Sequence, residues 1–338
     1  MADLKYLVRV AGGMSGKKLA YAIDTVRRHS GRSKLFIFLD MCVCMLRYGA
    51  GYFDYMMYGF WDLTAAQRAT YVTRLSNKKI QSLMNNDEFS YVFDNKNVFN
   101  KLFAKYLRRE TLDAETMTED ELAAFLPGKE YIFAKPNKGS CGTGVERLTV
   151  ADFADVGALY RYIKEKNFGV VEQAVKQHPD MAALYPHSVN CMRIVTDLVD
   201  DQVHIAYIVV KMGTHGAVVD NSGQGGVLCA VDPATGKIKS IAVDDYTNTY
   251  ECHPDTGVSF VGYQLPMVDQ AIALVSAAAR EPSANQTHHI GWDVAIAEDG
   301  PVIIEGNDYP GTDLCQLYAH TPEKCGLLPY YKKLLPNL

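Results

Sequence analysis

Near its C-terminus the chain reads GWDVAIAEDGPVIIEGN over residues 291–307, and this segment carries the clearest folding signal in the sequence. Two runs rich in β-branched residues flank Glu298-Asp299-Gly300. A three-residue loop with glycine in its left-handed position is a common β-hairpin connection. The segment therefore predicts an antiparallel hairpin in which Ala297 faces Pro301.

The register of this hairpin places two acids opposite each other. One face is apolar and carries the pairs Val294–Ile304 and Ile296–Val302. On the other face Asp293 lies opposite Glu305, and Asn307 follows on the same side. Like charges that face each other destabilise a sheet, so the pair requires a counter-ion. Hard oxygen ligands suit Mg²⁺, so we expect a magnesium site; the alternative is an exposed edge where the acids point into water.

A glycine-rich segment, KPNKGSCGTGV at residues 135–145, follows a strand-like run at 131–135. Its glycines allow backbone N–H groups to approach an anion, and its hydroxyls add donors. The spacing is neither the P-loop pattern nor the dinucleotide fingerprint. Lys135 beside this loop and Lys96 at a predicted helix start supply positive charge for a phosphate. The alternatives are a plain flexible hairpin and, for Lys96, a solvated surface lysine.

Composition narrows the class of protein. The 338 residues include 34 basic and 39 acidic ones, and the formal charge of −5 argues against a general nucleic-acid binder. The eight cysteines show neither a CxxC pair nor zinc-type spacing, so we expect reduced core thiols in a reducing compartment. The N-terminus lacks the features of a signal peptide. The apolar run 35–46 is too short to span a bilayer and predicts a buried helix. These features predict a cytoplasmic protein without membrane insertion.

The first ninety residues favour helices. Leu19, Ile23 and Val26 have helical spacing, and Thr64-x-x-Gln67 is a capping box that predicts a helix through Leu75. The aromatic segment 49–61 predicts packing against the next domain, with an aromatic ligand surface as the alternative.

The rest of the chain mixes both element types. The predicted elements are a short strand at 91–93, a helix at 96–107 capped by Asn95, a helix capped by Thr118 that ends at 127–128, and helices near 152–165 and 266–280. Between them lie apolar β-rich runs separated by turn residues. This mixture predicts an α+β fold with largely antiparallel sheets.

The order of Lys96, the glycine-rich segment and the 291–307 hairpin resembles the ATP-grasp superfamily. The closer resemblance is to the sugar-transfer-associated ATP-grasp proteins, and it covers roughly residues 50–312. It is carried by Phe53-Asp54-Tyr55, Val170-Val171-Glu172-Gln173-Ala174, Gln177-His178-Pro179, Ser188-Val189-Asn190-Cys191-Met192-Arg193, Lys211 with Asn221 and Gly225-Gly226, and GWDVAI…GPVIIEGN. The resemblance implies two α+β lobes with a nucleotide between them. The implied division is a helical region at 1–90, an ATP-grasp domain at 91–330 with lobes at 91–175 and 176–330, and a tail at 331–338.

The resemblance also implies roles for individual residues. Lys96 and Lys135 would contact the phosphates of ATP, and the loop residues Gly139, Ser140, Gly142 and Gly144 would close over them. Glu172 and the backbone near Ala174 would hold adenine, with the ribose near His178 or Asp180. Asp293, Glu305 and Asn307 would hold Mg²⁺, as two ions, and Arg193 and Lys211 would neutralise the transferred phosphoryl group. Relatives commonly carry Thr in place of Cys191 and Arg in place of Lys211.

The function implied is a carboxylate–amine ligase that uses ATP and Mg²⁺ and forms an amide through an acyl phosphate, in polysaccharide or natural-product biosynthesis. Its partners would be a small-molecule carboxylate and an amine, and homodimers are frequent in the superfamily. One alternative is an ATP-grasp kinase that phosphorylates a hydroxyl. Another is a non-catalytic nucleotide-binding scaffold. We expect removal of either hairpin acid to abolish turnover and leave the fold intact, because it relieves repulsion.

Overall fold

The computed structural model describes residues 15–139, 143–218, 220, 225–245, 247–281 and 286–338. The chain splits into two compact units. One combines Met1–Met84 with Gly311–Leu338, and the other is Asn85–Pro310. The sequence had not predicted that the C-terminal segment groups with the N-terminal helices. In the described part of the chain, no helix is long and apolar enough to cross a membrane.

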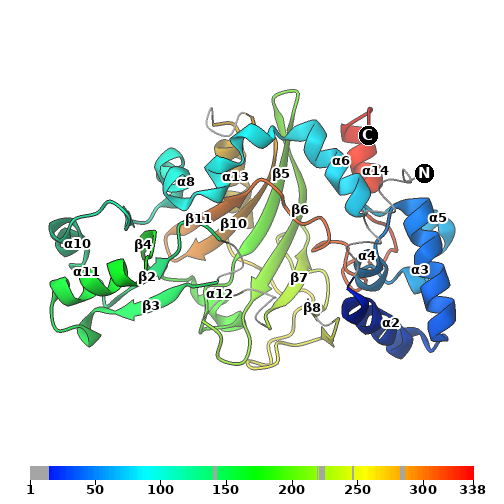
Figure 1. Ribbon diagram of the computed structural model, residues 1–338, viewed down its shortest axis with the longest axis horizontal. Helices are drawn as coiled ribbons and strands as arrows, with labels where there is room; N and C mark the ends of the chain where they lie inside the picture. Colours follow the sequence, from blue (N-terminus) through cyan, green and yellow to red (C-terminus); the bar gives the residue numbers. More distant parts are fainter. Residues whose placement is uncertain (1–14, 140–142, 219, 221–224, 246, 282–285) are drawn as a thin grey trace. The chain divides into compact units, whose positions relative to one another are not determined.

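The first unit is helical. Its elements are α2 (Gly16–Ser30), α3 (Lys34–Tyr48), α4 (Tyr52–Met57), η1 (Phe60–Asp62), α5 (Ala65–Arg68), α6 (Arg74–Met84) and α14 (Leu328–Leu334) (Figure 1). The C-terminal segment joins them through the buried side chain of Gln316. Its Oε1 accepts a hydrogen bond from Val72 N at 2.9 Å, and its Nε2 donates one to Val72 O at 3.0 Å. An amide that satisfies both backbone groups fixes the position of a loop.

Two predictions for this unit need correction. The aromatic segment 49–61 forms the core of its own unit, where Tyr55, Tyr58 and Phe60 are buried with residues of α2 and α3. Helix α3 is only half buried: Ile37, Met41 and Cys44 face the core, whereas apolar side chains on its other side face outward. Because apolar residues occur on both sides of this helix, its sequence does not show which side is covered.

The capping boxes at Thr64 and Thr118 are confirmed, with the threonine side chains accepting from Gln67 N and Glu121 N. The helix after Thr64 ends at Arg68 and not at Leu75, because the β-branched residues of 70–73 favour an extended chain. The described cysteines are all free thiols, as expected. They are not all in the core, since Cys252 and Cys325 are exposed.

The second unit contains two antiparallel sheets with helices around them. Its helices are η2 (Asp87–Phe89), α7 (Tyr91–Asp94), α8 (Lys96–Leu102), α9 (Ala104–Leu107), α10 (Glu119–Phe125), η3 (Val150–Asp152), α11 (Val156–Glu165), α12 (Pro179–Leu184) and α13 (Val268–Ala279). The predicted strand at 91–93 is wrong, because these residues form α7. The predicted helix at 96–107 is two helices that meet at Phe103, and Asn95 caps the first by accepting from Val98 N at 3.0 Å. The helices expected near 152–165 and 266–280 are confirmed.

The smaller sheet has the strand order β1-β4-β2-β3. Its strands are β1 (Thr111–Asp113), β2 (Tyr131–Lys135), β3 (Glu146–Thr149) and β4 (Val170–Gln173). Helices α10 and α11 cover one side of this sheet, and their apolar residues share a core with Ile132, Leu148 and Val171 (Figure 1).

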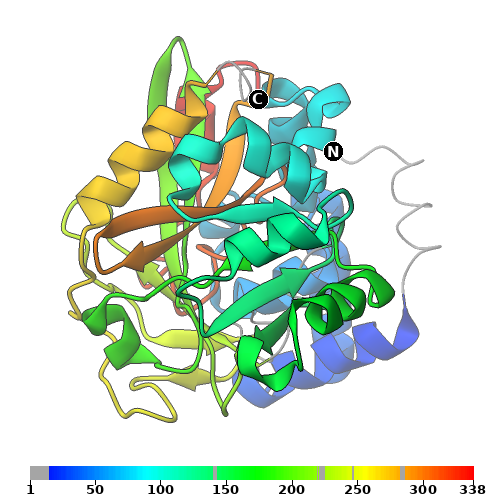
Figure 2. The same ribbon diagram turned by 90° about the vertical axis from the view of Figure 1, so that its left-hand side faces the viewer.

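The larger sheet has the strand order β11-β10-β5-β6-β7-β8-β9. Its strands are β5 (Met192–Val199), β6 (Gln202–Met212), β7 (Val227–Val231), β8 (Ala242–Asp244), β9 (Thr249–Tyr250), β10 (His289–Ala297) and β11 (Gly300–Asn307). Helix α13 lies across β5, β10 and β11 (Figure 2). It shares one core with α7–α9 and Trp292, which leaves the opposite face of β10 and β11 for a site.

The hairpin forms, but its register differs from the predicted one. Ala297 pairs with Gly300, so the loop has two residues, and the predicted pairs of Val294 with Ile304 and Ile296 with Val302 are wrong. A β-bulge then compensates for this one-residue change of register, because Ile304 has no pairing partner on β10. Asp293 therefore still pairs with Glu305, as predicted. Glycine is favoured at position 300 because its φ is +134°, a conformation that other residues rarely adopt.

Candidate functional site

The centre of the candidate site is the pair Asp293 and Glu305 on neighbouring strands. Asp293 is 3% exposed, on the face of β10 opposite the buried Trp292. The bulge brings both Ile304 and Glu305 to this same face. Asn307 lies two residues farther along β11, and its Nδ2 donates to Gly291 O at 3.3 Å, which leaves Oδ1 as a potential ligand. The three predicted metal ligands therefore line one cavity.

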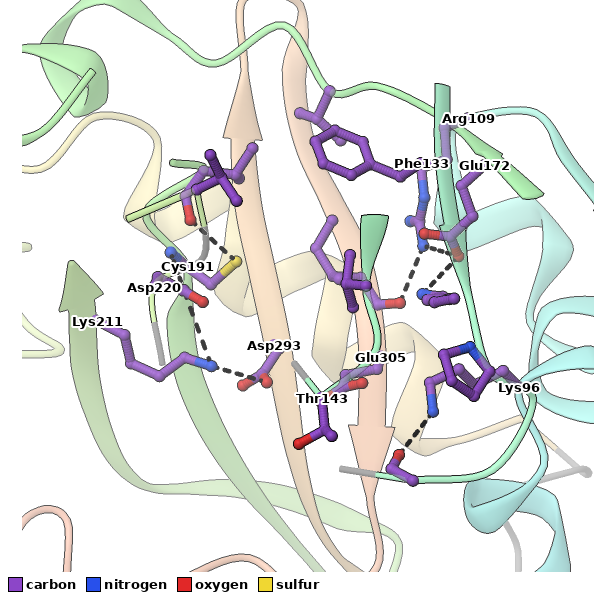
Figure 3. A pocket seen from close by; sticks show the side chains of 18 of the residues that line it. Lys96, Arg109, Phe133, Thr143, Glu172, Cys191, Lys211, Asp220, Asp293 and Glu305 are labelled. Carbon is purple, nitrogen blue, oxygen red and sulfur yellow. Dashed lines mark hydrogen bonds and ion pairs between the residues drawn. The ribbon is translucent and has the colours of Figure 1, made fainter. Parts of the chain in front are cut away.

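Two cations of the large sheet contact Asp293. Arg193 on β5 places Nε 2.5 Å from Oδ1, and Lys211 on β6 places Nζ 2.9 Å from Oδ2. Burial raises the pKa of Asp293, but the charges of Arg193 and Lys211 outweigh it and hold that pKa well below its usual range. Asp293 is therefore ionised and forms ion pairs with both Arg193 and Lys211. Figure 3 shows the contact with Lys211.

Glu305 has a different environment. In the described part of the chain, no side chain forms a hydrogen bond or ion pair with its carboxylate. Burial raises its pKa, and the negative charge of Asp293 raises it further. A half-buried carboxylate opposite a second one is stabilised by a cation that both can contact.

This donor set fits Mg²⁺. Both oxygens of Glu305, Oδ1 of Asn307 and the remaining lone pair of Asp293 are hard acceptors. Among the residues that the structure describes, no group of three or more His, Cys, Asp and Glu side chains gathers as a metal site, and the donor set of the hairpin combines two carboxylates with an amide.

The smaller sheet contributes a second charged cluster. Lys135 at the end of β2 places Nζ 2.7 Å from Oε1 of Glu172 on β4, and Arg109 places Nη2 3.1 Å from the same oxygen. Burial alone would raise the pKa of Glu172, but Arg109 and Lys135 lower it to about 2. Because both cations contact Oε1, Oε2 remains as a second acceptor.

Arg109 also reaches the hairpin. Its guanidinium donates to the carbonyl oxygens of Ile303 and Ile304, the latter at 3.0 Å, and its side chain is 3% exposed. One buried arginine thus joins the smaller sheet to β11. Nothing in the local sequence around Arg109 indicated this, because its partners lie more than sixty residues away.

The glycine-rich loop leaves β2 next to helix α8. Lys96 Nζ donates to Gly139 O at 2.7 Å, and Asn97 N donates to Asn137 Oδ1 at 3.2 Å. Gly144 has φ +75°, and a Cβ there would lie 3.0 Å from Pro136, so only glycine fits easily. The predicted residues Ser140 and Gly142 lie outside the described residues, as does Asn221.

A cavity of about 370 Å³ unites these groups. Of the predicted site residues, it is lined by Lys96, Lys135, Gly139, Glu172, Arg193, Lys211, Asp293, Glu305 and Asn307. Figure 3 shows Lys211, Asp293 and Glu305 directed toward the same space as Lys96 and Glu172. Residues far apart in the sequence therefore meet at one place, and their roles remain predictions.

Three predicted residues are not among those that line the cavity. Gly144 falls between Thr143 and Val145, and Ala174 falls between Gln173 and Val175; these neighbours do line it. His178 caps α12, where its Nδ1 accepts from Asp180 N at 3.2 Å. The ribose assignment to His178 or Asp180 stays a prediction.

Sequence reasoning missed several lining residues. Besides Arg109, Asp220 lines the cavity; its Oδ2 accepts from Cys191 N at 2.9 Å and lies 3.9 Å from Lys211 Nζ. Burial raises the pKa of Asp220, and Asp293 raises it further while Lys211 lowers it. The position of Asp220 directly before the predicted Asn221 was the available signal. Apolar residues complete the wall, namely Phe133, Val145, Val175, Val189, Val218 and Ile304.

Comparison with known families agrees with this arrangement. A model of the sugar-transfer associated ATP-grasp family matches residues 75–324. The chain belongs to this family. The ATP-grasp match includes every described residue of the cavity and the α+β sheets around it. No curated protein matches the chain.

Solved ATP-grasp structures resemble the chain at low identity. D-alanyl-alanine synthetase A from Vibrio cholerae is 13% identical with a TM-score of 0.40, over 76% of this chain and 66% of its own. The ATP-grasp ligase PsnB, complexed with a minimal precursor, is 11% identical with a TM-score of 0.44, over 75% and 64%. L-amino acid ligase from Bacillus licheniformis is 16% identical with a TM-score of 0.40, over 70% and 48%. The chain thus spans less than two thirds of the length of each of these proteins.

Proposed function

We propose that this ATP-grasp protein is a Mg²⁺- and ATP-dependent ligase that joins a carboxylate to an amine. One observation carries the proposal: a single cavity gathers five cationic side chains together with the two opposed carboxylates of the hairpin. The cations are Lys96, Arg109, Lys135, Arg193 and Lys211, and the opposed carboxylates are Asp293 and Glu305. Phosphoryl transfer requires chiefly positioning and charge neutralisation, which such a set supplies without a nucleophilic side chain.

The nucleotide is assigned to the cavity by shape and chemistry. Its volume of about 370 Å³ lies in the range of small-molecule sites. Phe133, Val175 and Ile304 offer apolar walls to a base, and Oε2 of Glu172 offers an acceptor to an exocyclic amine. Lys96 and Lys135, next to the glycine-rich loop, would then bind the phosphates.

Magnesium is assigned to the hairpin. Asp293, Glu305 and Asn307 would hold it, and the bound ion would supply charge neutralisation for a triphosphate. The expectation of two ions remains part of the proposal. Arg193 and Lys211 are placed to balance the charge that accumulates on the transferred group.

The reaction we infer has two steps. A substrate carboxylate oxygen attacks the γ-phosphorus of ATP. The bond between this phosphorus and the bridging oxygen breaks, and ADP leaves with its electron pair. The amine then attacks the acyl carbon of the resulting acyl phosphate, loses a proton, and displaces phosphate to leave an amide. Small-molecule substrates and a role in polysaccharide or natural-product biosynthesis belong to this proposal. A cytoplasmic location is supported by the seven described cysteines, all free thiols.

A screen for ADP release, with carboxylates tested against amines, examines this function. We expect ADP and free phosphate in equal amounts, only when an acid, an amine and Mg²⁺ are all present. Phosphate retained on a hydroxyl product would indicate the kinase alternative. Binding of ATP without turnover across a broad set of pairs would favour the non-catalytic scaffold. A Lys135→Met variant is the control, and it should lose ADP release under every condition.

A further inference from the structure

Helix α3 turns a broad apolar face outward. Six of its side chains are between 39% and 69% exposed, namely Leu35, Phe36, Phe38, Leu39, Val43 and Leu46. At 3.6 residues per turn these six lie on the side opposite Ile37, Met41 and Cys44, which face the core. A contiguous apolar patch of this kind on a folded unit marks a surface that another partner covers.

Basic residues lie at both ends of this face. The guanidinium of Arg32 lies 5.1 Å from the centre of the Phe36 ring, and Lys34 and Arg47 lie at the two ends of α3. Residues 15–48 contain seven lysines and arginines against two aspartates, although the whole chain carries a net charge of −5. The cations are Lys17, Lys18, Arg27, Arg28, Arg32, Lys34 and Arg47. Such local asymmetry favours an anionic partner.

Both aspartates of this region are already paired. Asp24 contacts Lys34 at 2.6 Å. Asp40 contacts Arg68 at 2.7 Å and accepts from the Tyr55 hydroxyl, on the inner side of α3. Within the described residues 15–48, every carboxylate is therefore in an ion pair. Asp24 neutralises Lys34, so Arg32 and Arg47 supply the net positive charge beside the apolar face.

A second copy of the chain is a poor occupant for this face. In a two-fold contact of α3 with itself, parallel or antiparallel, Lys34 and Arg47 would face lysines or arginines, and like charges across an interface are unfavourable. At about 200 Å² for a large free side chain, the six residues expose roughly 600 Å². A specific dimer buries about 800 Å² on each partner.

We propose that α3 docks the first unit on a membrane surface rich in anionic phospholipids. With 15 residues the helix is about 22 Å long, and it would lie in the plane of the interface. Its apolar side chains enter the acyl boundary, and the surrounding lysines and arginines contact the phosphates of the headgroups. The proposal is independent of the ligase function, because it uses no residue of the cavity.

Sedimentation of the full chain with vesicles tests this proposal. One set of vesicles is phosphatidylcholine alone, and the other is an equimolar mixture with phosphatidylglycerol. We expect at least about tenfold stronger binding to the mixed vesicles, lost when sodium chloride is raised from about 0.1 to 1 M. The double variant Leu39→Gln/Leu46→Gln should weaken binding at least about tenfold. The double variant Arg32→Gln/Arg47→Gln should weaken binding to the mixed, anionic vesicles about thirtyfold and leave binding to phosphatidylcholine vesicles unchanged.

The matched control is Leu83→Gln/Val261→Gln, which removes two exposed apolar side chains outside α3, at 46% and 59% exposure. It should bind like the wild type, and all variants should keep the wild-type melting temperature and ATP turnover. Equal binding to both vesicle types, no binding to either, or unchanged binding of Leu39→Gln/Leu46→Gln would each overturn the proposal. If the wild type is a dimer and Leu39→Gln/Leu46→Gln is a monomer, the face binds a second copy of the chain and the membrane proposal is wrong.

Discussion

The Nζ atom of Lys211 lies 2.9 Å from Oδ2 of Asp293, with Arg193 on the other oxygen of the same carboxylate. None of the three side chains is more than 14% exposed. Buried charges are stable only when paired, so Asp293 stabilises the positive charge of Arg193 and Lys211 as well as lining the cavity. Glu305 makes no such pair among the described residues, and burial together with Asp293 raises its pKa. Removal of one acid should therefore differ in its effect from removal of the other.

Asp293→Asn should abolish ATP turnover and also destabilise the fold. The asparagine keeps the shape but removes the ion-pair partner of the buried Arg193 and leaves Lys211 with Asp220 alone, at 3.9 Å. Loss of these contacts costs about 3 kcal/mol or more. This revises the sequence-based expectation that loss of either acid spares the fold. Urea unfolding gives the free energy, and ADP release gives the activity. An unchanged unfolding midpoint would show that the two cations do not depend on Asp293.

Glu305→Gln should abolish turnover while the fold keeps its stability. Because the folded pKa of Glu305 is raised, its ionisation destabilises the fold as the pH rises through that pKa, and glutamine removes this effect. We expect an unfolding free energy at pH 8 equal to or above that of the wild type. The same urea series measures it beside Asp293→Asn. Retained turnover would remove Glu305 from the metal site.

Acid should weaken the pair of Lys135 and Glu172. The folded pKa of Glu172 is about 2, below its ordinary value of 4.5. Ionised Glu172 therefore contributes fully to the free energy of unfolding above about pH 4.5, and this contribution is lost as the pH falls toward 2. A shift of this size corresponds to about 3 kcal/mol. Urea midpoints of the wild type and Glu172→Gln, measured from pH 7 down to the lowest pH at which both fold, should converge below pH 4.5. A constant difference across this range would contradict the pKa assignment.

The hairpin shows what a sequence pattern can and cannot determine. The alternation of apolar and polar residues, with a turn sequence between, was sufficient to predict that Asp293 faces Glu305. It did not determine the loop length, because a two-residue loop with a bulge at Ile304 gives the same pairing as a three-residue loop without one. Alternation thus locates the side chains of a site, whereas the route of the backbone depends on local geometry such as the φ of +134° at Gly300.

Other features depend on contacts between distant residues. Arg109 was not predicted, because its partners Glu172 and Ile304 approach it only in the folded chain. The two faces of α3 were not predicted either, since both are apolar and only the packing of α2 and α4 determines which is buried. In contrast, the cap at Asn95 depends on residues within one helical turn and was predicted correctly.

Arg109→Ala should loosen the contact between the smaller sheet and the hairpin. The change leaves two carbonyls of β11 without this donor and Glu172 with Lys135 alone, at a cost of about 3 kcal/mol. Arg109→Lys keeps the charge but cannot make the same forked contacts, so we expect an intermediate loss. Thermal unfolding measures the stability, and titration with ATP should show weaker binding in the same order. Equal effects of Ala and Lys would show that only charge matters there.

The two substitutions of Lys211 should separate charge from geometry. Lys211→Met removes the positive charge beside Asp293 and Asp220, and we expect turnover to fall at least about 100-fold. Lys211→Arg keeps the positive charge and a donor for Asp293, so turnover should stay within about tenfold of the wild type. ATP binding, measured by calorimetry, should change less than turnover in both variants, because Lys211 is assigned to the transferred group and not to the bound nucleotide. If Lys211→Met loses binding and turnover equally, Lys211 belongs with Lys96 and Lys135 as a contact to the bound phosphates.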